Sequence, residues 1–277
     1  MPEGYDLHAH SNRSDGTLTP AEVMSLAAAR DLVGIALTDH DTFEGLSEAT
    51  SASEWLGLEL VPGIEFSAEH DGASLHILGY WVDAADPAVN DELDRLTATR
   101  LRRGELIVEK LQELGYDVDF DRVREIAGGQ TIARPHVAQA MVEAGIVATE
   151  TEAFERYISD DGPAYVPKHA LDPTRALHLI RSAGGACVLA HPGMWRGSDS
   201  VPEELIERMA DEGMVGLEVW HPDHDEAARE RYATLARRLG LVATSASDCH
   251  GERYGYRLGT ERTDADTYAE LRRRAGR

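Results

Sequence analysis

Seven short, largely apolar runs recur along the chain and predict buried strands that begin near residues 5, 34, 58, 75, 186, 216 and 241. Stretches with apolar residues at helical spacing separate most of these runs. Strands that alternate with helices are typical of an α/β fold. Between the third and fourth runs, His70-Asp71-Gly72 predicts a tight hairpin turn.

Helix signals divide the chain into two parts. Thr19-Pro20-Ala21-Glu22 is a capping box with proline at the first helical position, and it predicts a helix to about residue 32. A long helical pattern starts at Asp86-Pro87. From residue 98 to residue 168 only helical patterns occur. We therefore expect a β/α domain formed by residues 1–97 and 169–277, with a small helical insert domain at 98–168.

The first apolar run leads into a pair of histidines, His8 and His10. Residues two apart in a strand point to the same face, so both imidazoles can bind one ion. Asp15 offers a carboxylate oxygen from the loop that follows. Imidazole and carboxylate together suit Zn, Fe or Mn better than Mg or Ca.

Further candidate metal ligands lie where other apolar runs end or, in one case, begin: His40, Glu65, His76, His191, Asp248 and His250. Polar residues gathered at the carboxyl ends of strands are the expected arrangement of a β/α-barrel active site. The sequence therefore predicts one metal centre at one end of a barrel.

The composition restricts the partners. The net charge is −23, and among the 27 basic residues only Lys110 and Lys168 are lysines. This acidity argues against a broad nucleic-acid-binding face, so no duplex DNA binding is expected. An anionic substrate is still compatible, because bound divalent ions and local arginines reverse the charge inside a pocket. The acidic, lysine-poor composition fits a salt-rich cytoplasm, although a GC-rich genome would also favour arginine over lysine.

Targeting signals are not apparent. No apolar run of 18 residues occurs, and the N-terminus has neither a basic flank nor an apolar core segment, so we expect no membrane span and no secretory signal. The two cysteines, Cys187 and Cys249, both fall in predicted strands. A disulfide framework is therefore not expected, and a cytoplasmic location fits.

The helical insert carries a second feature of interest at residues 131–136, where Arg134 and His136 stand at a predicted helix start. A helix N-terminus with these side chains can bind an anion. A capping turn with a solvated arginine is the alternative. Lys168, at the end of the insert, is a further candidate for anion binding.

Six motifs in order (H-x-H, S-D-G, T-D-H-D, G-I-E-F, A-H-P and D-x-H) resemble the PHP (polymerase and histidinol phosphatase) family. The resemblance implies a distorted seven-stranded β/α barrel with a trinuclear site for divalent ions such as Mn, Fe or Zn. It places His8, His10 and Asp248 on the first ion, with Glu65 bridging to a second ion on His76 and His191. Asp15, His40 and His250 would bind the third. Some members have histidine in place of Asp15, so we expect two to three ions, with the third held more weakly.

The insert narrows the resemblance to the subgroup that acts on 3',5'-nucleoside bisphosphates, some relatives of which trim short RNA from the 5' end. Arg134 and His136 match its phosphate-binding positions, whereas Lys168 and His221 match less securely. The implied substrate is a small nucleotide bisphosphate, such as 3'-phosphoadenosine 5'-phosphate, or a short oligoribonucleotide.

The implied reaction is hydrolysis of the 3'-phosphate. Two ions sharing Glu65 are expected to supply a bridging hydroxide, because coordination lowers the pKa of water from 15.7 to about 7. Glu65 and Asp248 are then catalytic as well as ligating, and the third ion or His221 would assist the leaving oxygen. Arg134 and His136 would bind the second, non-reacting phosphate.

Other functions stay open at this point. A histidinol-phosphate phosphatase uses the same ions on a monophosphate, and a 5'-3' exoribonuclease acts on a chemically similar end. A non-catalytic metal-binding PHP module is disfavoured because all nine ligand positions are filled. An amidohydrolase that acts on a C–N bond shares the barrel arrangement.

Overall fold

The computed structural model describes residues 4–128, 132–159, 161–167, 171–194, 200–252 and 255–277. The chain divides into two compact units, Met1–Asn90 with Ala170–Arg277, and Asp91–His169. The sequence-based boundaries at residues 98 and 168 remain a prediction about domains, because compactness alone does not show that either unit folds independently.

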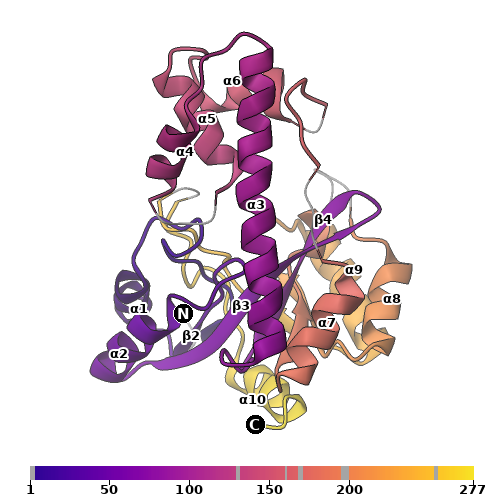
Figure 1. Cartoon of the computed structure of the whole chain (residues 1–277). Coiled ribbons are helices and arrows are strands. Elements are labelled where there is room, and N and C mark those ends of the chain that lie inside the picture. The colour runs from indigo at the N-terminus through magenta and orange to yellow at the C-terminus, as the bar shows by residue number, and fades with distance from the viewer. Residues whose placement is uncertain (1–3, 129–131, 160, 168–170, 195–199, 253–254) are drawn as a thin grey trace. The chain divides into compact units, whose positions relative to one another are not determined.

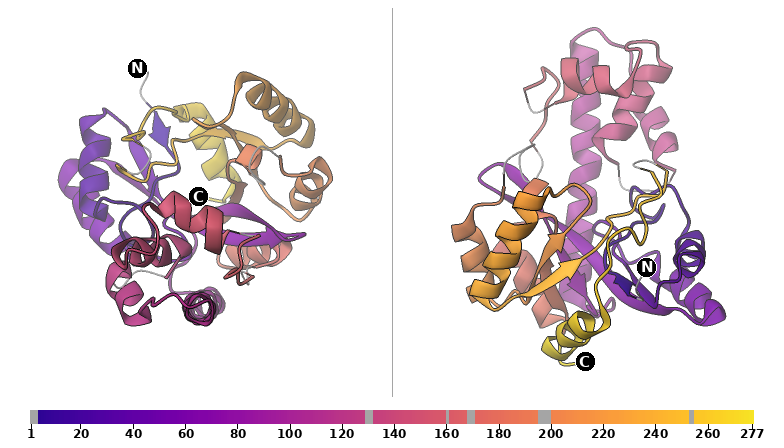
Figure 2. Two further views of the ribbon diagram at one scale, coloured as in Figure 1. Left: turned by 90° about the horizontal axis from the view of Figure 1, so that it is seen from above. Right: turned by 180° about the vertical axis from the view of Figure 1, so that it is seen from behind.

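The first unit contains the predicted seven strands, in one sheet whose spatial order follows the chain. The strands are β1 (Tyr5–Asp6), β2 (Gly34–Leu37), β3 (Glu59–His70), β4 (Ala73–Tyr80), β5 (Ala186–Leu189), β6 (Gly216–Trp220) and β7 (Val242–Ser245). Figures 1 and 2 show the helices around this sheet. They are α1 (Pro20–Ala29), α2 (Leu46–Leu56), α7 (Pro173–Ser182), α8 (Glu203–Asp211), α9 (Glu226–Leu239) and α10 (Ala265–Arg274). The predicted α/β barrel is confirmed.

One strand runs against the others and distorts the barrel. β4 is antiparallel to both β3 and β5, whereas every other neighbouring pair is parallel. The predicted hairpin joins β3 to β4, with Asp71 and Gly72 in left-handed conformations (φ 50° and 75°) as a two-residue hairpin turn requires. The amino-terminal part of β4 therefore lies at the edge where the parallel strands have their carboxyl ends.

The barrel is nearly closed between its first and last strands. Ala9 forms a parallel bridge to Cys249, and the His10 amide donates to the Cys249 carbonyl at 2.9 Å. The buried carboxylate of Asp6 accepts hydrogen bonds from the Ser247 amide and hydroxyl and from the Gly259 amide. Burial raises the pKa of Asp6 to about 6, although these hydrogen bonds favour the charged form. One side chain thus joins the segments that follow β7 to β1.

Apolar side chains fill both the barrel and the layer outside it. Leu7, Leu78, Tyr80 and Val188 belong to a buried cluster within the barrel, where the Tyr80 hydroxyl donates to the Leu7 carbonyl at 2.8 Å. A second cluster packs α1 and α2 against the first strands. Both helices begin or end as the sequence indicates: α1 has the predicted capping box, and α2 ends at a left-handed Gly57. Removal of these apolar surfaces from water stabilises the frame that positions the ligands.

Every regular element that the structure describes in the second unit is helical. It contains most of α3 (Pro87–Glu113), α4 (Phe120–Ala127), α5 (Arg134–Glu143), α6 (Glu150–Ala153) and a π-helical turn over Phe154–Ile158. Its own core includes Ile107, Leu111, Val123, Val137 and Ile158, all nearly inaccessible to solvent.

Within the described residues, no helix is both long enough and apolar enough to span a membrane.

Candidate metal centre

The nine predicted metal ligands come together at one edge of the barrel. Seven of the ligands come directly after β1, β2, β5 or β7, and the other two, Glu65 and His76, lie on β3 and β4. Their ligand atoms form four groups, each within 4.8 Å: His10, Asp15, His40 and His250; His8, Glu65 and His191; His8, His10 and Asp248; His40, Glu65 and His76. Each group has the nitrogen and oxygen donors that suit Mn, Fe or Zn.

The predicted histidine pair lies at the centre of the cluster. The Nε2 atoms of His8 and His10 are 3.1 Å apart, and both side chains are fully buried. Asp248 Oδ1 lies 3.3 Å from His8 Nε2 and 3.2 Å from His10 Nε2. Glu65 Oε2 lies at nearly the same distances from the two nitrogens, 3.3 Å and 3.2 Å. These four side chains are therefore arranged to share one cation.

Glu65 also faces the other imidazoles. Its Oε1 lies 3.1 Å from His76 Nδ1 and 3.2 Å from His191 Nε2, and its Oε2 lies 3.0 Å from His40 Nδ1. His76 and His191, which the family resemblance assigns to one ion, thus face the same oxygen. The carboxylate is placed to bridge neighbouring cation positions.

The third predicted group is built on the loop after β1. His250 Nε2 lies 3.2 Å from Asp15 Oδ1, and the His250 ring stacks on His10 with centroids 4.2 Å apart. Asp39, which the sequence analysis left without a role, accepts hydrogen bonds from Ser11 and from the Ser14 hydroxyl, each at 2.7 Å. These bonds fix the loop that carries Asp15.

Two of the nine residues have a strained backbone. His191 and Asp248 have φ values of 23° and 49°, in the left-handed region that non-glycine residues rarely adopt. Each such residue costs about 1–3 kcal/mol, and strain of this kind clusters at functional sites. This strain lowers the stability of the fold, and the strained backbone directs the two side chains into the cluster.

The carboxylates are held in their charged form. Burial alone would raise the pKa of Glu65, but the imidazoles of His40, His8 and His76 lower it well below its usual range. Burial likewise opposes ionisation of Asp248, and the neighbouring His8 and His10 lower its pKa well below the usual range. Ionised carboxylates are the form that binds a cation.

Several buried polar atoms of the cluster lack a hydrogen-bond partner, which agrees with their use as metal ligands. Four buried atoms of the cluster have no hydrogen-bond partner among the described residues: His40 Nδ1, Glu65 Oε2, His76 Nδ1 and Asp248 Oδ1. Buried polar atoms without partners are rare in folded proteins. Two ligands bound 2.0–2.1 Å from one ion lie about 2.8–3.4 Å apart, depending on the coordination geometry. The observed separations of 3.0–3.3 Å around Glu65 match this range, so the donors fit divalent cations.

His221 lies beside the nine ligands, and one of its ring nitrogens is taken by a backbone hydrogen bond. It follows β6 and is fully buried, and its Nδ1 accepts a hydrogen bond from the Asp223 amide at 3.1 Å. The neutral ring therefore carries its proton on Nε2, which lies 3.5 Å from Asp248 Oδ2. A buried N–H group that has no hydrogen-bond partner among the described residues therefore lies beside the cluster.

The predicted phosphate-binding residues lie in the second unit. Arg134 Nη1 donates to the Ile158 carbonyl at 3.2 Å, and its guanidinium lies over the Phe154 ring. His136 Nδ1 accepts from the Ala133 amide at 3.1 Å, so this side chain caps α5. The capping turn is therefore present, and the role of both residues toward a substrate stays a prediction. Lys168 lies outside the described residues.

One buried residue of the cluster escaped the sequence analysis. Glu218 lies in the middle of β6, with Oε1 3.2 Å from His8 Nδ1 and Oε2 2.7 Å from the His191 amide nitrogen. The available signal was a single glutamate inside the apolar run Gly216-Leu217-Glu218-Val219-Trp220. Buried glutamates are rare unless paired.

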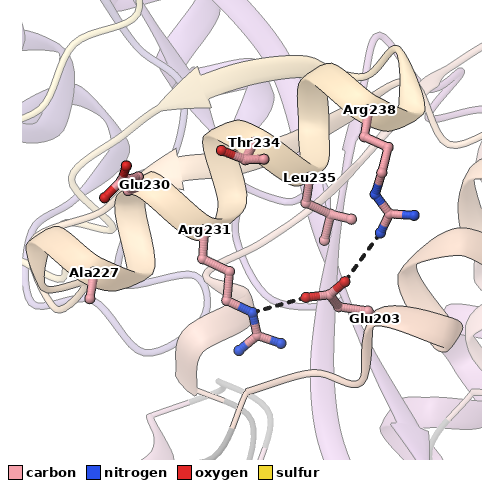
Figure 3. A pocket seen from close by; sticks show the side chains of 7 residues that line it. All are labelled: Glu203, Ala227, Glu230, Arg231, Thr234, Leu235 and Arg238. Atoms are coloured by element: carbon pink, nitrogen blue, oxygen red, sulfur yellow. Dashed lines mark hydrogen bonds and ion pairs between the residues drawn. The ribbon is translucent and has the colours of Figure 1, made fainter.

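A groove along α9, shown in Figure 3, lies elsewhere on the first unit and contains none of the nine candidate ligands in its lining. Its volume is about 420 Å³, and within it Glu203 is paired with Arg231 at 3.2 Å and with Arg238 at 3.1 Å. A smaller cavity of about 110 Å³ adjoins the cluster itself and includes His76 and His191 in its lining.

Comparison with known proteins agrees with this geometry. The PHP domain model matches residues 6–134. A 3',5'-nucleoside bisphosphate phosphatase from Chromobacterium violaceum is 36% identical over 253 residues, which cover 91% of this chain and 89% of the relative. The 5'-3' exoribonuclease Rnm of Salmonella typhimurium is 34% identical over 248 residues, or 89% and 85% of the two chains.

A solved structure extends the likeness to three dimensions. A protein from Bifidobacterium adolescentis, named a metal-dependent phosphoesterase, shares 35% sequence identity with a TM-score of 0.89. The match covers 99% of this chain and 97% of that one. The similarity therefore includes the sequence of both units.

Proposed function

The chain belongs to the PHP family of metal-dependent phosphoesterases, and on that premise we propose that it hydrolyses the 3'-phosphate of 3',5'-nucleoside bisphosphates. The observation that carries the proposal is the cluster around Glu65, where five imidazoles lie within 3.0–3.3 Å of one buried carboxylate. Such a cluster suits hydrolysis of phosphate esters, since that reaction needs concentrated positive charge.

Nine side chains are proposed to bind two to three divalent ions, of Mn, Fe or Zn: His8, His10, Asp15, His40, Glu65, His76, His191, Asp248 and His250. When bound, such ions lower the pKa of coordinated water to about 7 and neutralise phosphoryl oxygens. Glu65 and Asp248 contribute by holding their negative charge between the imidazoles, which keeps the ligand atoms together at neutral pH.

His221 is proposed to assist the leaving ribose oxygen by donating a hydrogen bond from Nε2. Its Nε2 carries the proton because the Asp223 amide occupies Nδ1, so the ring is neutral and donates a hydrogen bond without giving up its proton. Burial keeps bulk water from that nitrogen. A positioned hydrogen-bond donor of this kind typically contributes a factor of about 10²–10³ to the rate.

The second phosphate is proposed to bind Arg134 and His136, with Lys168 as a weaker candidate. Support comes from their chemistry: a guanidinium and an imidazole at the N-terminus of α5, where backbone amides also favour an anion. An amine-bearing substrate such as histidinol phosphate would instead be expected to meet carboxylates at its second recognition point.

The test is a parallel assay of the Mn-loaded full-length protein on 3'-phosphoadenosine 5'-phosphate and histidinol phosphate. We expect release of inorganic phosphate and adenosine 5'-phosphate from the first, with little turnover of the second. Preferred turnover of histidinol phosphate, or release of the 5'-phosphate, would refute the proposal.

A second candidate is 5'-3' exoribonuclease activity, favoured by the 34% identity to Rnm over most of both chains. A nucleotide with phosphate on both sides resembles the 5' end of RNA, so one site can accept both. A 5'-phosphorylated tetraribonucleotide decides the matter: stepwise release of mononucleotides from the 5' end indicates the exoribonuclease, and an intact oligonucleotide excludes it.

A further inference from the structure

Glu218 is a fully buried carboxylate that the reaction outlined above does not use. It occupies the third position of the five-residue strand β6, between Leu217 and Val219, both of which are also fully buried. A buried charge is costly unless it is paired and hydrogen-bonded. Its two oxygens therefore need partners, and both partners belong to residues proposed as metal ligands.

The first partner is the ring of His8. Glu218 Oε1 lies 3.2 Å from His8 Nδ1, while His8 Nε2 lies 3.3 Å from both Glu65 and Asp248. A neutral imidazole has one proton, so a histidine that binds a cation through Nε2 must carry that proton on Nδ1. A carboxylate beside Nδ1 selects this tautomer and also fixes the plane of the ring.

The second partner is the backbone of His191. Its amide donates to Glu218 Oε2 at 2.7 Å, a length typical of a hydrogen bond to a charged acceptor. His191 is also one of the strained residues, with φ of 23°. A strained conformation persists only where the surroundings hold it, and this hydrogen bond provides such a restraint.

We propose that Glu218 is a positioning residue of the metal centre, which sets the tautomer of His8 through Oε1 and the backbone of His191 through Oε2. It acts on two ligands from one rigid strand without facing the cation positions itself. The proposal rests on the proposed function in one respect, namely that His8 and His191 bind divalent cations.

Glu218→Gln separates this role from general packing. Glutamine keeps the size of the side chain, but it has one acceptor and one donor in place of two acceptors. If its amide group faces His8, it donates to Nδ1 and moves the ring proton to Nε2, where a cation should bind. If its amide group faces His191, two N–H donors oppose each other. The first arrangement impairs cation binding by His8, and the second impairs cation binding by His191.

Glu59→Gln is the matched control. Glu59 is the first residue of β3, six residues before Glu65, and its carboxylate accepts hydrogen bonds from the Tyr5 and Tyr268 hydroxyls. Both variants exchange a hydrogen-bonded carboxylate for an amide of the same size, so both should be less stable than the wild-type protein. Only Glu218→Gln should alter the metal centre.

The experiment is titration of metal-free, full-length proteins with Mn²⁺, with bound metal measured by calorimetry and elemental analysis. We expect Glu218→Gln to weaken Mn²⁺ binding about 10- to 100-fold, the usual effect of losing such a partner. Glu59→Gln should bind Mn²⁺ as the wild type does. Equal binding by wild type and Glu218→Gln would overturn the positioning role. A wild-type protein that binds no Mn²⁺ would instead refute the proposed function, and this role with it.

A measurement on the wild-type chain keeps the proposal testable even if Glu218→Gln does not fold. In ¹⁵N-histidine-labelled, zinc-loaded protein, the two ring nitrogens of His8 are distinguished by their chemical shifts, with His8→Asn used for assignment. We expect the proton on Nδ1. A proton on Nε2 would overturn the proposal.

Discussion

Among the described carboxylates of the centre, Glu65 faces the largest number of histidines. It is fully buried, and five histidine nitrogens lie within 3.3 Å of its two oxygens. Such a residue stabilises the fold only while its charge is matched. The residues proposed as ligands, as hydrogen-bond donor to the leaving group and as substrate contacts should respond differently to substitution, which allows their roles to be separated.

Arg134→Ala tests the contact to the second phosphate. Loss of a hydrogen bond between charged groups costs about 1.5–3 kcal/mol, so kcat/KM for the bisphosphate should fall about 10- to 100-fold. An aryl phosphate, which has no second phosphate, should be turned over as before. Arg122→Ala, an exposed arginine of the same unit paired with Glu143, is the control. Equal losses on both substrates would contradict the assignment of Arg134.

His221→Ala tests the hydrogen bond to the leaving oxygen. Because a poor leaving group develops negative charge that needs stabilisation, kcat on the ribose 3'-phosphate should fall about 10²- to 10³-fold. Hydrolysis of p-nitrophenyl phosphate should fall far less, because p-nitrophenolate is stable without this hydrogen bond. His178→Ala, on α7, is the control. An unchanged ratio between the two substrates would exclude this role, as would loss of bound metal in the variant.

At the scale of secondary-structure elements, a few close contacts fix the loops that carry the candidate ligands. The loop after β1 turns so tightly that a Cβ at Gly16 would lie 2.6 Å from the His10 carbonyl oxygen. Hydrogen bonds from Ser11 and Ser14 to Asp39 tie this loop to the segment that follows β2. The position of Asp15 therefore depends on a glycine next to it.

Gly16→Ala should displace that loop and weaken the cation group of Asp15, His40 and His250. We expect loss of about one bound ion per chain by elemental analysis, with the ions around Glu65 retained. Gly57→Ala is the matched control, since that glycine has a left-handed φ of 66° and no neighbours within 4 Å of a Cβ. It should cost stability without changing metal content. Full metal content in Gly16→Ala would contradict the prediction.

The sequence predicted the helices and strands better than the contacts between side chains from different parts of the chain. The spacing of His8 and His10 predicted that they share one face, and their Nε2 atoms are 3.1 Å apart, although β1 ends at Asp6 and both residues lie beyond it. The hairpin signal at His70-Asp71-Gly72 was correct. Glu218 was missed because a lone glutamate in an apolar strand has no ligand spacing, and its partners come from distant parts of the chain. The left-handed backbones of His191 and Asp248 could not be predicted, because tertiary contacts impose them.

At the scale of the whole molecule, the metal centre should also contribute to stability. A cation that binds only the folded state stabilises it by about 2.7 kcal/mol at a concentration of 100 Kd. For a protein of this size that corresponds to a rise in Tm of about 5–10 °C. Chelation should therefore lower Tm by this amount, and Mn²⁺ should restore it. Glu65→Gln should show little response to either treatment, and a wild-type Tm that is insensitive to both would contradict the prediction.

The net charge predicts how the stability of the whole molecule depends on salt concentration. At −23 the folded chain repels itself, and the repulsion is screened over about 10 Å in 0.1 M salt but about 3 Å in 1 M. The free energy of unfolding, measured with urea, should therefore increase from low to molar KCl. Indifference to KCl would remove the idea of adaptation to a salty cytoplasm.

The near-closure of the barrel between β1 and the segment after β7 also has a consequence for biosynthesis. His8 and His10 leave the ribosome long before Asp248 and His250, which lie about 240 residues further along the chain. Until the later segment emerges, Asp6 lacks Ser247 and Gly259, and the nascent chain offers an incoming ion the two histidines without Asp248. Metallation of this group is therefore expected to wait until the segment after β7 has been synthesised and has joined β1.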